Sequence, residues 1–329
     1  MHSSTSSFKT LPQGWFSLIV GAGLAVALLA GWELLWRQRG YMPSITDSET
    51  LWCSEREHVA RDSVVIAGSS RLQAGLDPAI LSSVLGGRDV RQLAINGANP
   101  TPTLIDLGND ESFAGVVVLE YMPLRIFTAD EGSVGRTEAF VLACRSSTLV
   151  ATIDAAMSRV IQKRFVYMSP ELHPITIVSH LHRHHALPRN SYSLLRRDRY
   201  LALTFSSDVG DAGEEQSRRW TAEPTPTALD ERLAVMAAAV ERIQARGGRV
   251  VLYRPPVTKG ILADEEKHFP SATWLPRVAT KLRVRYIDFA QLPGLANITS
   301  PDGGHLAATD VPGVTETIGS ELQRVLAMP

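Results

Sequence analysis

Three residues far apart in the chain have side chains that together can carry out nucleophilic chemistry. Ser70 ends the run Gly68-Ser69-Ser70, while Asp302 and His305 share the segment Asp302-Gly303-Gly304-His305-Leu306. A serine hydroxyl attacks an acyl carbon when a base takes its proton, and an imidazole acts as that base when a carboxylate orients it. We therefore interpret the three as a candidate catalytic triad. The alternative is a Gly-Ser turn and a polar loop with an incidental histidine.

Five short apolar runs predict the strands that would position these residues. They cover residues 63–67, 90–95, 116–119, 249–253 and 284–288, and such runs are typical of strands buried on both faces. Helical patterns separate them, most clearly over 227–246. This alternation predicts an α/β fold with a parallel, helix-flanked sheet. Sites in such sheets form at the carboxyl ends of strands. Ser70 would lie there at a helix N-terminus, whose dipole favours a developing negative charge.

The N-terminal part predicts a membrane anchor. Residues 15–32 contain no charged side chain, and a transmembrane helix over 15–36 would carry Trp15, Trp32 and Trp36 near its ends. About 20 apolar residues cross a bilayer, and tryptophan favours its interfaces. The Ser/Thr-rich residues 1–14 are predicted to be disordered.

Two observations on this segment leave alternatives. Ala25-Val26-Ala27 resembles a signal-peptide cleavage site, although the apolar run continues beyond it. Lys9 precedes the run and Arg37 and Arg39 follow it, so the positive-inside count alone places the C-terminal part in the cytoplasm.

The rest of the chain is predicted to comprise a connector with a short helix over 37–62 and one domain over 63–329. A helical insertion over 128–223 interrupts that domain, and its longest helix is expected over 137–165. The formal net charge of −1 argues against nucleic acid as a partner. Cys53 and Cys144 either pair as a disulfide or remain separate buried thiols.

The order of these motifs resembles the SGNH (GDSL-like) hydrolase superfamily. A strand leads into Gly68-Ser69-Ser70, a glycine-containing loop follows the second strand, and Asp-x-x-His-Leu lies near the C-terminus. The chain is most similar to the membrane-anchored branch that includes alginate O-acetylation and teichoic-acid D-alanylation proteins. The resemblance implies a three-layer α/β/α domain outside the cytoplasm, anchored in the cytoplasmic membrane.

The resemblance also implies roles for single residues. Ser70 corresponds to the nucleophile, His305 to the general base and Asp302 to the residue that holds its tautomer. The backbone N–H groups of Ser70 and Gly97 would form the oxyanion hole. The family's third block, which normally supplies an oxyanion-hole asparagine, is absent after the third strand, and Asn99 is considered as its substitute.

Arg71, Glu120 and Arg254 are candidate substrate-binding residues, with a structural carboxylate as the alternative for Glu120 and a surface side chain for Arg254. The cluster His180, His182, His184 and His185 is interpreted as a basic solvated or membrane-facing surface rather than a metal site. Arg196 to Arg199 is likewise interpreted as a solvated face.

These observations lead to two functional hypotheses. The first is a serine esterase or O-acyltransferase that acts, without cofactor or metal, on acetyl or other acyl groups of a cell-surface or exported polysaccharide. A membrane-bound acyltransferase is then a candidate partner. The second is a catalytically silent SGNH-like scaffold subunit, which the missing third block favours. Hydrogen-bonding distances among Ser70, His305 and Asp302 distinguish the two hypotheses.

Overall fold

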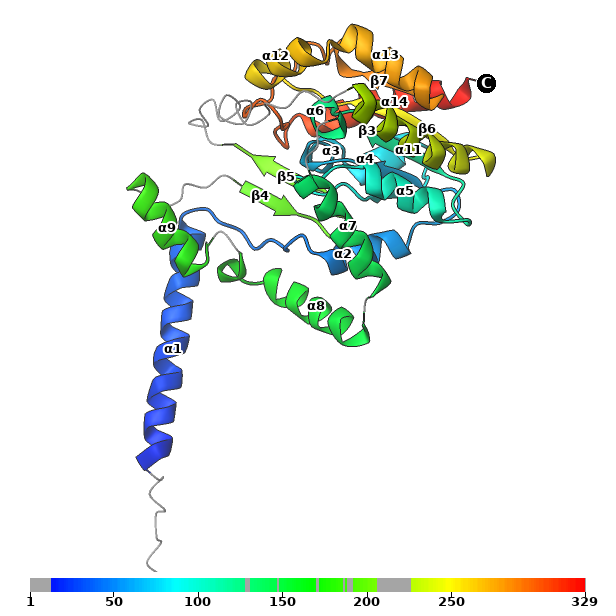
Figure 1. The fold of residues 1–329 in the computed structure, drawn as a ribbon. Helices are drawn as coiled ribbons and strands as arrows, with labels where there is room; N and C mark the ends of the chain where they lie inside the picture. The colour runs from blue at the N-terminus through cyan, green and yellow to red at the C-terminus, as the bar shows by residue number, and fades with distance from the viewer. Residues whose placement is uncertain are drawn as a thin grey trace, which may run out of the picture. The chain divides into compact units, whose positions relative to one another are not determined.

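The computed structural model describes residues 13–127, 131–146, 148–169, 172–185, 187, 192–205 and 226–328 (Figure 1). Its contacts divide the chain into two compact units. The first comprises residues 1–43 and 160–190, and the second comprises 44–159 and 191–329. The predicted disorder of residues 1–14 falls almost entirely outside the described residues.

The helices in chain order are α1 (Gln13–Gln38), α2 (Glu49–Glu57), α3 (Ser70–Gly75), α4 (Pro78–Val84), α5 (Thr101–Asn109), α6 (Pro123–Phe127), α7 (Glu131–Arg145), α8 (Leu149–Gln162), the 3-10 helix η1 (Val166–Met168), α9 (Pro174–His184), α11 (Pro226–Ala245), α12 (Lys259–His268), α13 (Ser271–Leu282), the 3-10 helix η3 (Phe289–Gln291) and α14 (Val311–Ala327).

The larger unit is built on a five-stranded parallel sheet. Its strands are β1 (Val64–Ala67), β2 (Val90–Gln92), β3 (Val116–Glu120), β6 (Arg249–Arg254) and β7 (Arg285–Asp288), in the spatial order β2-β1-β3-β6-β7. All of β1 and β3 is buried, as expected for strands covered on both faces. The predicted α/β fold with a parallel sheet is confirmed.

Helices cover both faces of this sheet (Figure 1). On one face, alternate strand residues such as Val65 and Val117 pack with buried residues of α5, α11 and α13. On the other face, their neighbours Val64 and Val116 pack with buried residues of α3, α4 and α14. Successive strand side chains point to opposite faces, so each strand contributes to two apolar layers and the unit has three layers.

The region predicted as a helical insertion differs from the prediction in two respects. One long helix over 137–165 is wrong, because α7 ends at Arg145 and α8 begins at Leu149. Polar residues lie at this break, and the hydroxyl of Thr148 accepts the Ala151 N–H at 3.2 Å, which is a typical N-terminal cap. The region also contains an antiparallel pair, β4 (Tyr192–Leu195) and β5 (Leu201–Thr204).

The second predicted strand is also shorter than expected, since β2 ends at Gln92, and a buried arginine binds the carbonyl of that residue. Arg199 is fully buried, donates to the Gln92 carbonyl at 2.8 Å and pairs with Asp47 at 2.8 Å. Arg196 makes two 2.7 Å hydrogen bonds to Asp77. The interpretation of residues 196–199 as a solvated face is therefore wrong for the buried Arg199 and right for the exposed Arg197, while the side chain of Arg196 is 41% exposed and paired. The guanidinium groups of Arg196 and Arg199 join the segment between β4 and β5 to the sheet domain.

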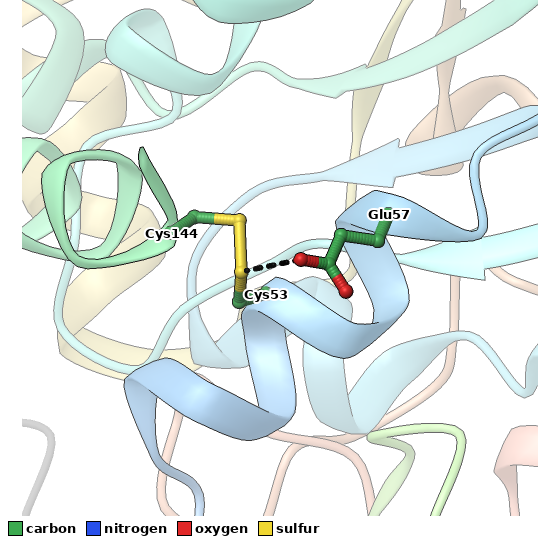
Figure 2. A group of neighbouring side chains, drawn as sticks. All are labelled: Cys53, Glu57 and Cys144. Atoms are coloured by element: carbon green, nitrogen blue, oxygen red, sulfur yellow. Dashed lines mark hydrogen bonds between the residues drawn. A yellow bond between two sulfur atoms is a disulfide. The ribbon is translucent and has the colours of Figure 1, made fainter. Parts of the chain in front are cut away.

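A disulfide joins α2 to α7. Cys53 and Cys144, 91 positions apart, are bonded with their Cα atoms 5.0 Å apart. The carboxylate of Glu57 lies 3.6 Å from the sulfur of Cys53 (Figure 2). The two sulfurs are bonded to each other, so neither is available as a thiolate to ligate a metal. Of the alternatives left open by the sequence, the structure has the disulfide.

The smaller unit contains α1, η1 and α9. Within α1, an 18-residue window reaches a mean hydropathy of 2.1, and α1 is the one unbroken helix in the described chain that is long and apolar enough to cross a membrane. At its C-terminal end, Trp36 and Tyr41 form a small core with Val166, Leu172 and Ile177.

Candidate active site

The turn between β1 and α3 places Ser70 at the carboxyl end of a central strand. Ser70 is the first residue of α3, and the side chain of Ser69 caps the helix by accepting the Arg71 N–H at 3.3 Å. The first N–H groups of a helix have no acceptor within the helix. The Ser70 N–H therefore lies at an end that can stabilise negative charge near the serine oxygen.

The buried carboxylate of Glu120 fixes this turn. It accepts a short hydrogen bond from the Ser69 N–H and a 3.1 Å hydrogen bond from the Ser69 hydroxyl. A Cβ atom on Gly68 would lie 2.6 Å from the same carboxylate, so the close approach requires glycine at that position. Glu120 is 0% exposed, and the structural role that the sequence left as its alternative is the one observed.

The three residues of the predicted triad lie together. The Nε2 atom of His305 is 2.7 Å from the Ser70 Oγ, and its Nδ1 atom is 2.7 Å from Asp302 Oδ2. The structure thus joins, in the order serine, imidazole and carboxylate, two segments that are 235 positions apart. Distances of about 2.6–3.2 Å are those required for proton transfer between a nucleophile and its base.

The loop itself holds the carboxylate of Asp302 in place. Its Oδ1 atom accepts the backbone N–H groups of Gly304 at 3.0 Å and His305 at 2.8 Å. Burial opposes ionisation of this carboxyl group, but hydrogen bonds from the His305 ring and the two N–H groups outweigh it and lower the pKa of Asp302. The carboxylate is therefore ionised at neutral pH and can accept a hydrogen bond from the Nδ1–H group of His305.

A cavity of about 50 Å³ opens beside the serine. Its lining includes all three residues of the triad. The other residues that line it are Ser69, Arg71, Met122, Leu124, Arg125, Ile261, Asp264 and Gly304. The side chains of His305 and Asp302 remain 23% and 22% exposed, so a ligand in the cavity can reach the triad from solvent.

Arg71 lines the cavity and is held by a buried partner. Its guanidinium pairs at 2.7 Å with Glu265, whose side chain is 1% exposed. Burial raises the pKa of the nearby Glu120, although the charge of Arg71 opposes that effect. Arg71 therefore brings a positive charge to the lining of the cavity, where it is paired with Glu265.

The predicted oxyanion-hole residues of the second loop, Gly97 and Asn99, are not among the described residues that line the cavity. The role of the Gly97 N–H stays a prediction. The Asn99 amide donates to the Arg125 carbonyl at 2.9 Å, and its oxygen accepts the Thr101 N–H at 2.9 Å. Asn99 is thus engaged with backbone groups and does not replace the missing third-block asparagine.

Arg125 also lines the cavity, although the sequence did not indicate it as a site residue. It lies on α6, directly after β3 where the third block is absent. Its Nη1 donates to the Gly97 carbonyl at 2.5 Å. The sequence feature that could have indicated this residue is an arginine five positions after the end of β3, the strand that ends at the site.

Two other sets of residues singled out from the sequence are not among the described residues that line the cavity. Arg254 is 3% exposed, so it is not the surface side chain considered as its alternative; it binds Glu266 at 2.5 Å and does not line the cavity in the described structure. The predicted surface histidines lie on or next to α9. The one cluster of metal-ligating side chains in the described residues is that of the disulfide cysteines and Glu57.

The resemblance of this chain to known proteins is distant. No protein-family model matches the chain, and no curated protein matches it. Among solved structures, the crystal structure of TesA is similar, with a TM-score of 0.36 and 14% identity over 80% of this chain and 99% of TesA. A TM-score of this size supports no conclusion about function. The functional proposal therefore depends on the geometry of the site.

Proposed function

We propose that this chain is a membrane-anchored serine hydrolase or O-acyltransferase of the SGNH type. The observation that supports it is the pair of 2.7 Å contacts that link Ser70 to His305 and His305 to Asp302 beside a cavity. In the proposed reaction, Ser70 attacks an ester carbonyl as His305 takes its proton. His305 then returns the proton to the leaving alcohol, and water or a sugar hydroxyl resolves the acyl-enzyme.

Two donors are proposed to stabilise the oxyanion. The Ser70 N–H lies at the start of α3, and the guanidinium of Arg125 lines the same cavity. A charged donor compensates for the absent asparagine, because hydrogen bonds from ionised groups are stronger than neutral ones. The absence of the third block is therefore compatible with catalytic activity.

The proposed substrate is a short acyl ester, chiefly acetyl, on a cell-surface or exported polysaccharide. The small volume of the cavity, about 50 Å³, favours a short acyl group. The hydropathy of α1 supports anchoring in the cytoplasmic membrane. A membrane-bound acyltransferase that supplies or accepts the acyl group is the partner proposed with it.

The disulfide supports an extracytoplasmic location for the domain. Disulfides persist in oxidising compartments such as the periplasm and are rare in the cytosol. The positive-inside count of Arg37 and Arg39 against Lys9 is the opposing signal.

The experiment is hydrolysis of p-nitrophenyl acetate by the full-length chain in detergent. We expect Ser70→Ala to lower kcat/KM by at least about 10³-fold, whereas Ser112→Ala, an exposed serine bonded to Asp110, leaves the rate unchanged. A fluorophosphonate probe should label the wild type and not Ser70→Ala. Equal rates for wild type and Ser70→Ala would eliminate the enzyme and favour the scaffold.

A further inference from the structure

Helix α9 carries an apolar face that no described part of the chain covers. Ile175 is 74% exposed, Val178 is 64% exposed and Leu181 is 44% exposed. Their spacing of three residues places them on one side of the helix. Thr176 and Arg183 lie on the opposite side. Such an amphipathic helix, polar and basic on one face, is typical of segments that lie in a membrane interface.

The position of α9 relative to α1 indicates which surface covers this face. Ile177 of α9 packs into the small core with Trp36 and Tyr41, at the C-terminal end of α1 (Figure 1). Counting about 20 residues from Trp15 places the end of a membrane span near Leu35. Trp36, and with it α9, therefore lies at the depth of the lipid headgroups.

Polar contacts hold the chain that leads to α9 at the same depth. The Glu33 carboxylate accepts the N–H groups of Val166 and Tyr167, each at 3.0 Å. Arg37 pairs with Glu33 and also donates to the Arg164 carbonyl at 2.7 Å. A carboxylate near the end of a membrane span is costly unless it is paired, so these bonds stabilise both the span and the returning segment.

We propose that α9 lies in the interface of the bilayer that α1 spans, with Ile175, Val178 and Leu181 at the boundary with the acyl chains. Arg183 on the polar face lies toward the headgroups, and interfacial helices with basic polar faces are attracted to anionic lipids. This inference depends on the membrane anchoring proposed above, but it is independent of the proposed reaction. It gives the histidine-rich segment 180–185 a place at the membrane surface.

The test places an environment-sensitive fluorophore, NBD, on single cysteines of the full-length chain in nanodiscs of phosphatidylcholine and phosphatidylglycerol. The native cysteines form a disulfide, so the added thiol reacts alone. The positions are Val178→Cys on the apolar face, Thr176→Cys on the opposite face as the matched control, and Leu24→Cys, 61% exposed in the middle of α1, as the control for anchoring.

We expect the label at Val178 to emit at shorter wavelength than the label at Thr176. Lipids with a nitroxide near the headgroup should quench it, and aqueous iodide should reach only the label at Thr176. Equal iodide access at both positions would overturn the inference. Shielding from iodide without quenching by nitroxide lipids would also overturn it, because a protein surface would then cover α9.

The label at Leu24 separates this inference from the anchoring on which it depends. Quenching at Leu24 by nitroxides deep in the acyl chains, with a water-exposed label at Val178, refutes the interfacial helix alone. If the label at Leu24 is also accessible to iodide, the anchoring fails as well. The esterase assay on Ser70→Ala is unaffected by either result.

Discussion

Replacing Asp302 by asparagine would reverse the hydrogen-bonding polarity of the triad while conserving its shape. Because Asp302 Oδ1 accepts two backbone N–H groups, at 3.0 and 2.8 Å, the asparagine oxygen must take that position. Its amide group then faces the Nδ1 atom of His305, which lies 2.7 Å from the present carboxylate. The opposite orientation would direct the amide N–H groups at two other donors.

The new amide forces His305 into the other tautomer. Nδ1 becomes an acceptor, the proton moves to Nε2, and Nε2 can no longer accept the proton of Ser70 from 2.7 Å away. A triad with the wrong tautomer loses about 10⁴ in rate, which corresponds to about 5 kcal/mol of transition-state stabilisation. Stability should change much less, because both backbone hydrogen bonds to the loop remain.

The assay is kcat/KM for p-nitrophenyl acetate with wild type, Asp302→Asn and Asp302→Ala, together with the denaturant midpoint of each. We expect both variants to lose activity and only the alanine variant to lose the two loop hydrogen bonds and the stability they provide. An asparagine variant within tenfold of wild-type activity, measured where Ser70→Ala is inactive, would refute the assigned role of His305 as a base oriented by Asp302.

Three further outcomes are expected. Gly68→Ala places a Cβ 2.6 Å from the buried carboxylate beside it and should cost about 1–3 kcal/mol in unfolding free energy, whereas Gly313→Ala, which meets nothing within 4 Å, should cost nothing. Reducing the Cys53–Cys144 bond, which closes a loop of 91 positions, should lower stability by about 4–5 kcal/mol on the loop-entropy model, and an unchanged denaturant midpoint in dithiothreitol would contradict this. Since the pKa of Asp302 is lowered on folding, its stabilisation is present above pH ~4 and is lost as the pH falls through the folded-state value. Asp302→Asn should therefore weaken the acid dependence of the denaturant midpoint, and an identical acid dependence in both proteins would exclude this linkage.

The sheet and the triad segments could be predicted because their signals are local in the sequence. Continuous apolar runs identify buried strands, and the end of such a run places Ser70 at the edge of a parallel sheet. The pairing of Ser69 with Glu120, 51 positions away, and of Arg199 with Asp47, 152 positions away, could not be predicted. Arginine and glutamate are mostly exposed residues. No local pattern in the sequence indicates that Arg199 and Glu120 are buried, or which distant residue each of them contacts.

The burial of Glu120 is also an argument about activity. Burial raises the pKa of this carboxyl group, so an ionised Glu120 in the core is unfavourable, and an apolar side chain packed there would avoid that penalty. What the carboxyl group provides is the position of Ser69, through the N–H and the hydroxyl that it binds. That turn sets the direction of the Ser70 hydroxyl toward His305. If Ser70 is the proposed nucleophile, the rate depends on the distance and direction of its hydroxyl, which this buried carboxyl group helps to set.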